Sequence, residues 1–145
     1  MGSFAIERRR MVHAPARTIW DELAETAAWP AWKPFISRVS SPAGGFKPGA
    51  RFTMSIRIKG PWAVPVPVTI LELDPPRKMA WTGGLPGLAR SVHSFVLEEA
   101  DGRTEVISRE EFTGALVGLM LRFVTERDLA RLHDDWLAAI AARVE

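Results

Sequence analysis

Polar and apolar residues alternate along much of this chain, and near its end the period changes to that of a helix. Phe4 to Val12 alternates and predicts a β-strand, which Pro15 ends. Residues 16–24 repeat apolar side chains at helical spacing, at Ile19, Trp20 and Leu23. Pro15 suits the start of that helix, where a missing N–H costs nothing.

The middle of the chain is expected to be a series of strands. Pro30 marks a second short helix, and a strand should begin at residues 35–39. Residues 51–58 alternate strictly, the pattern of a half-buried strand. Val64 to Leu73 is apolar on both faces with prolines near its start, which is typical of an edge or bulged strand. Another strand should carry Met79 and Trp81 into the glycine-rich turn 83–87.

A hairpin is predicted from residues 91–98 and 103–112 around Ala100-Asp101-Gly102. Matching the apolar faces pairs Leu97 with Thr104 and Phe95 with Val106. That register places His93 opposite Ser108 and diagonal to Glu110, all on the inward face, within reach of one another.

From Gly114 onward, apolar residues recur every three or four positions. A continuous helix from Ala115 to Arg143 would be about 43 Å long at the usual rise per residue. The predicted order is therefore a strand, two short helices, about six strands and a long helix. We expect an α+β fold in which a curved antiparallel sheet of about six to seven strands wraps around the C-terminal helix, leaving a pocket lined by alternate strand residues.

The composition suits one globular domain over residues 1–145, with 47% hydrophobic and 25% charged residues. The 19 basic and 17 acidic residues are interspersed and give no footprint for nucleic acid. Arg8, Arg9 and Arg10 alternate between opposite faces of their strand. With no cysteine in the chain, disulfides and thiolate chemistry are excluded.

We expect a cytoplasmic protein. The N-terminal segment lacks the apolar run of a signal peptide. The apolar run 115–121 stops at Arg122, far short of the ~20 residues that a membrane span needs.

Short motifs in a fixed order extend through the whole chain. They are Ala14-Pro15 with Ile19-Trp20, Trp29-x-x-Trp32-x-Pro34, Gly49, Pro75-Pro76-x-x-Met79-x-Trp81, His93-x-Phe95-x-Leu97, Gly102-x-Thr104-x-Val106 and Glu110-x-Phe112-x-Gly114. Through them the sequence resembles the START-like superfamily, in the branch of polyketide cyclase/dehydrase and lipid transport. The resemblance implies a helix-grip fold. It does not name a ligand, because lipid carriers, aromatase/cyclases, hormone receptors and chaperone activators share that fold.

The predicted function is binding, transport or sequestration of a small hydrophobic or amphipathic ligand, such as a lipid or polyketide-like molecule, in an internal cavity. One alternative is a cyclase, aromatase or dehydratase in which His93 and Glu110 move protons. A second is a protein-interaction module. We expect no cofactor and a monomer or weak homodimer.

The predicted ligand-binding residues fall into three groups. His93, Ser108 and Glu110 would orient a polar group, although they would also suit a purely structural hydrogen-bonded cluster. The apolar lining would come from residues that would equally suit the core, namely Met54, Ile56, Met79, Trp81, Phe95, Met120 and Phe123. Trp29 and Trp32 should flank the opening, and Trp20 should lie in the core. Trp62 should either lie at the mouth or anchor the loop that carries it.

Other motifs that could indicate phosphate binding, metal binding or a catalytic nucleophile do not meet the requirements for these functions. The turn 83–87 lacks the Gly-Lys-Ser/Thr ending of a phosphate-binding loop. His13, His93 and His133 belong to separate elements without ligand-type spacing, so no metal site is predicted. The chain has no Gly-x-Ser-x-Gly nucleophile motif.

Overall fold

Seven antiparallel strands form one curved sheet in the order β1-β7-β6-β5-β4-β3-β2 in the computed structural model, which describes residues 2–33, 35–42, 44–58, 60–85 and 87–145. Pro34 and Pro86, which belong to a predicted motif and a predicted turn, lie outside the described residues. The strands are β1 (Gly2–Val12), β2 (Ile36–Val39), β3 (Arg51–Ile56), β4 (Val64–Asp74), β5 (Lys78–Leu85), β6 (Ala89–Ala100) and β7 (Arg103–Gly114). The helices are α1 (Ala16–Ala24), η1 (Thr26–Ala28), α2 (Trp29–Trp32), α3 (Val117–Phe123) and α4 (Glu126–Val144).

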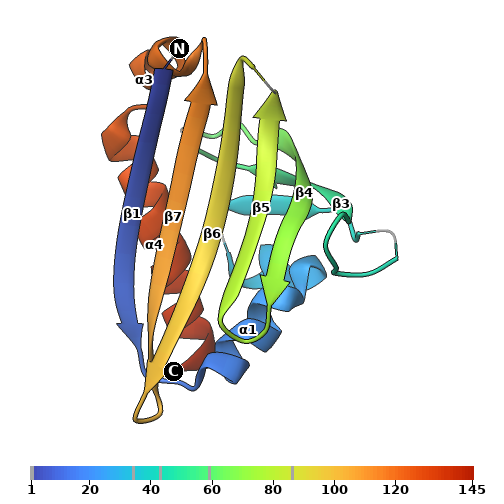
Figure 1. Ribbon diagram of the computed structural model, residues 1–145, viewed down its shortest axis with the longest axis vertical. Helices are drawn as coiled ribbons and strands as arrows, with labels where there is room; N and C mark the ends of the chain where they lie inside the picture. The colour runs from blue at the N-terminus through green and yellow to red at the C-terminus, as the bar shows by residue number, and fades with distance from the viewer. Residues whose placement is uncertain (1, 34, 43, 59, 86) are drawn as a thin grey trace.

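The long helix α4 lies behind β1 and β7, and α1 crosses the lower end of the sheet (Figure 1). The buried face of α4 contains Leu129, Leu132, Trp136, Leu137 and Ile140, at three- and four-residue spacing. This arrangement confirms the predicted helix-grip fold and the order of its elements.

The C-terminal helix is not continuous, and that prediction was wrong. Val124 leaves the helical conformation, and α4 starts again after Thr125. The Thr125 side chain accepts a hydrogen bond from the Asp128 backbone N–H, and the Asp128 carboxylate accepts one from the Thr125 N–H. This capping box satisfies two N–H groups at the new helix start. The break lets α3 lie over the end of the sheet near Gly2 while α4 follows the inner face.

The predicted hairpin register was also wrong, by two residues. Ala100 pairs with Arg103, so Leu97 faces Val106 and His93 faces Glu110. The connection is a two-residue turn in which Asp101 and Gly102 both have positive φ. Asp-Gly favours this turn because its backbone twist matches that of the two strands. Since strand side chains repeat every two residues, a shift of two leaves His93, Ser108 and Glu110 on the predicted face.

Trp29 lies at the centre of the core and not at an opening as predicted. Its ring is fully buried and lies 5.3 Å from the ring of Trp136, 5.7 Å from that of Trp81 and 6.0 Å from that of Phe52, between centroids. Trp32 is partly buried against the same cluster. The short α2 therefore packs against both the sheet and α4. Trp20 is buried in the core as predicted.

Candidate ligand-binding cavity

A cavity of about 240 Å³ lies between the inner face of the sheet and the helices α3 and α4. Its volume is just below the range of about 300–1,000 Å³ typical of ligand pockets, which suits a small ligand. Six predicted site residues line it: Met54, Ile56, Trp81, His93, Glu110 and Met120. Most of the remaining lining is apolar and includes Ile58, Val66, Val68, Phe112, Val124, Leu129, Leu132 and Trp136.

The other predicted residues lie elsewhere. Met79 and Phe95 are fully buried in the core, farther along β5 and β6. Ser108 is buried beside the cavity, in contact with two residues that line it. Trp62 and Phe123 are exposed at the surface. The structure thus brings together the predicted polar group and four of the seven predicted apolar lining residues.

Four polar side chains form a continuous hydrogen-bonded chain at one side of the cavity. His93 Nε2 lies 2.8 Å from Ser108 Oγ, which lies 2.7 Å from His133 Nδ1. His133 Nε2 lies 2.9 Å from Glu110 Oε1. Ser108 and His133 are fully buried, whereas the Glu110 side chain retains 15% of its exposure. These hydrogen bonds therefore lead from a buried imidazole to a carboxylate that solvent reaches.

The three contacts restrict which atoms of the four side chains can carry protons. With Glu110 ionised and both histidines neutral, His133 Nε2–H donates to Glu110 and the Ser108 hydroxyl donates to His133 Nδ1. His93 Nε2–H then donates to Ser108 Oγ. Every contact is satisfied, and Nδ1 of His93 keeps its lone pair. The arrangement has a direction, because a proton taken up at His93 can be passed toward Glu110.

A larger and more open hollow, of about 620 Å³, lies on the outer side of β3, β4 and β5. Outward-facing Thr53, Thr69 and Thr82 are among its lining residues. It contains none of the four members of the polar chain, so we take the smaller inner cavity as the candidate site.

Residues 3–145 match the family described as polyketide cyclase / dehydrase and lipid transport. The chain belongs to this family. No curated protein matches the sequence.

Solved structures show that the fold of this family member is shared widely. The Zhui aromatase/cyclase from Streptomyces sp. R1128 superposes with a TM-score of 0.81 at 17% identity, covering 98% of this chain and 93% of that one. A START superfamily protein from Mycobacterium smegmatis gives 0.76 at 14% identity, covering 99% and 97%. The di-domain ARO/CYC BexL from the BE-7585A biosynthetic pathway gives 0.80 at 18% identity, covering 99% of this chain and 50% of that one. Identities this low establish a common fold and no more.

Burial sets the charge of His93 in this family member. Removal from water lowers the pKa of His93 well below its usual value, and the nearby His133 and Lys33 lower it further. His93 is therefore neutral at neutral pH, as the proton arrangement above requires. A neutral imidazole with a free lone pair can accept a proton from a bound molecule.

His133 was not among the predicted site residues, because its spacing from the other histidines was weighed only as a metal-ligand pattern. His133 lies four residues after Leu129 and three before Trp136, so helical periodicity places it on the buried face of α4. That position brings it to Ser108 and Glu110 on β7. Among the described residues, no cluster of three or more His, Cys, Asp or Glu has the arrangement of a metal site.

Lys33 was also missed, and it lies fully buried among three tryptophans. Its Nζ lies 3.5 Å from the ring centroid of Trp136, 4.1 Å from that of Trp29 and 4.4 Å from that of Trp32. Within the described part of the chain, Nζ has no hydrogen-bond acceptor. Burial lowers the pKa of Lys33 well below its usual value. Trp136 also lines the cavity, so Lys33 packs against one residue of the cavity wall.

None of the described helices is long and apolar enough to cross a membrane.

Proposed function

We propose that this protein binds a small apolar or amphipathic molecule in the cavity between the sheet and helices α3 and α4. The supporting observation is a predominantly apolar cavity whose polar lining side chains are concentrated in one hydrogen-bonded chain. Burial of apolar ligand surface would supply about 25 cal/mol per Å² before ordering costs. A ligand-sized void favours this function over a protein-interaction module with a filled interior.

The hydrogen-bonded polar side chains would favour ligands that carry a polar group at one end. His93 offers an acceptor at Nδ1, and Glu110 offers a partly solvated carboxylate. A hydroxyl or enol at the end of an otherwise apolar ligand would find a partner there. The same ligand without that group would leave the buried His93 acceptor unpaired, which costs about 1–3 kcal/mol.

Filling the cavity tests the proposal. Val66→Phe places a larger side chain in the lining, and Leu71→Phe makes the same kind of change at an exposed position of the same strand. We expect small apolar phenols to raise the melting temperature of the native protein and of Leu71→Phe, but not of Val66→Phe. Native mass spectrometry of the freshly purified protein would identify any co-purifying ligand. Equal stabilisation of both variants would reject the cavity as the binding site.

A second candidate function is proton-transfer catalysis of the cyclase, aromatase or dehydratase type. It is favoured by the directed chain from His93 through Ser108 and His133 to Glu110. His93 Nδ1 would take a proton from the ligand while Nε2 releases its proton to Ser108. Ser108 would pass its own proton to His133, and the resulting imidazolium would be stabilised by the Glu110 carboxylate.

Substitution of His93 distinguishes the two candidate functions. For an enzyme, His93→Gln should lower turnover of a poly-β-carbonyl compound by about 10²–10⁴-fold and leave its binding within a few fold. For a carrier, the same variant should change binding only, and the native protein should produce no cyclised or dehydrated product by mass spectrometry.

A further inference from the structure

The hollow on the outer side of β3, β4 and β5, called the outer hollow below, is a second place where a ligand could lie. Its volume is about 620 Å³. Two arginines and no Asp or Glu are among the described residues that line it. Its polar lining residues are Ser40, Arg51, Thr53, Thr69, Thr82 and Arg90. The proposed function uses none of them.

The outer hollow forms where short side chains lie between two long ones. In the sheet register, Arg51 on β3 faces Thr69 on β4, which faces Thr82 on β5. Gly84 on β5 has no side chain and faces Arg90 on β6. The strands β3 and β6 are three strand spacings apart, which is about 14 Å. The two arginines therefore border the recess on opposite sides.

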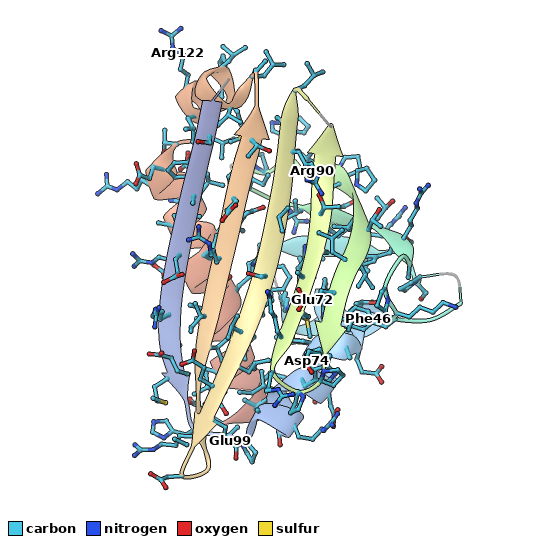
Figure 2. All side chains as sticks on the ribbon, viewed as in Figure 1. Phe46, Glu72, Asp74, Arg90, Glu99 and Arg122 are labelled. Atoms are coloured by element: carbon cyan, nitrogen blue, oxygen red, sulfur yellow. The ribbon has the colours of Figure 1, made fainter. Side chains whose placement is uncertain are left out.

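The charge of both arginines is unpaired within the described part of the chain, where neither forms an ion pair with a carboxylate. Other basic side chains on the same face of the sheet are neutralised, in the pairs Arg9–Glu105, Lys78–Glu72 and Arg109–Glu111. Figure 2 shows Arg90 on the visible face of the sheet, above Glu72 and Asp74. The outer hollow is therefore a region of unpaired positive charge, which favours an anionic ligand.

Hydroxyl groups add hydrogen-bond donors between the two arginines. Ser40 Oγ accepts a hydrogen bond from the Thr53 N–H at 2.8 Å, so its own proton remains available to a ligand. Thr82 Oγ1 donates to the Ser91 carbonyl oxygen at 2.8 Å. Among the described residues, the Thr69 hydroxyl beside it has no hydrogen-bond partner. Guanidinium and hydroxyl donors together are the groups that bind phosphate oxygens.

We propose that the outer hollow binds a small organic molecule that carries two phosphate groups. Because Arg51 and Arg90 lie on opposite sides of the recess, a ligand with an anionic group at each end pairs with both. The hydroxyls of Ser40 and Thr69 donate to phosphate oxygens that the arginines leave unpaired. This site does not depend on the proposed function, because the inner cavity lies on the other face of the sheet.

Calorimetric titration with glucose 1,6-bisphosphate, at constant ionic strength, tests the proposal. The native protein should bind it at least tenfold more tightly than glucose 6-phosphate and should not bind glucose. The double variant Arg51→Gln, Arg90→Gln should lose at least tenfold in affinity for the bisphosphate. The control variant Arg103→Gln, Arg127→Gln removes the same charge at two exposed positions outside the outer hollow and should bind like the native protein.

Amide NMR signals locate the bound molecule. The bisphosphate should shift the signals of Thr53 and Thr69 and leave those of Leu132 and His133, which line the inner cavity, unchanged. Without ligand, the double variant should melt at the native temperature, which shows that it is folded. The proposal would be overturned by no binding to the native protein, equal affinity for glucose 6-phosphate, equal binding by the double variant, or signal shifts confined to the inner cavity.

Discussion

His93 and His133 share a single hydroxyl group, that of Ser108, although they lie 40 positions apart in the sequence. Their ring centroids are 4.7 Å apart. Because Ser108 has one hydroxyl proton, it donates to one imidazole and accepts from the other. The role of one imidazole nitrogen as donor or acceptor is therefore tied to that of the other.

Ser108→Ala should break this link with little change in volume. It leaves a nitrogen of each histidine without its partner in a buried site, so the free energy of unfolding should fall by about 1–3 kcal/mol in urea denaturation. Ser94→Ala, on the outer face of β6, is the matched control and should change it by less than about 0.5 kcal/mol. A Ser108→Ala protein as stable as the control would mean that the hydroxyl does not join the two rings.

Stability should depend on pH through His93. Its pKa in the folded protein lies below the ordinary value of about 6.5, so the unfolded chain binds more protons between these two values. The free energy of unfolding should therefore rise with pH across that window and level off above about 6.5. His93→Phe should flatten the rise, whereas His13→Phe, at an exposed position, should retain it.

Lys33→Met should stabilise the protein at neutral pH. The pKa of Lys33 in the folded protein lies below the ordinary value of about 10.4, so the unfolded chain binds more protons between these two values. The free energy of unfolding of the native protein should therefore rise with pH up to about 10.4. Methionine fills similar space without a buried polar group, and a gain of about 1–3 kcal/mol is expected. Lys47→Met, at an exposed position, should have no such effect. Lower stability of Lys33→Met would show that contact between an ammonium and the three rings outweighs its burial cost.

Trp29→Ala should cost about 3–5 kcal/mol, because it removes the ring at the centre of the aromatic core. Trp62→Ala, whose ring is exposed, should change stability by no more than about 0.5 kcal/mol. Thermal or urea unfolding of both variants checks the contrast. Equal losses would contradict the assignment of Trp29 to the core.

Local patterns predicted much of the candidate site. Alternation on β6 and β7 placed His93, Ser108 and Glu110 on one face, and the error of two residues in register did not change that face. The pair Asp101-Gly102 favours a two-residue turn and so indicates the correct hairpin register. Thr125-x-x-Asp128 forms a capping box and so indicates that a new helix starts there. Reading these short signals alone would have corrected both predictions.

The sequence by itself determined the order of strands and helices, the inward faces and the family, because periodicity, turn chemistry and motif order are local properties of the chain. Only the tertiary structure decided that His133 completes the polar chain, that Lys33 lies among three tryptophans and that Trp29 is central while Trp62 is exposed. Those relations join α2, α4 and the sheet across long separations in sequence. They depend on how the helices pack over the curved sheet, which no local pattern specifies.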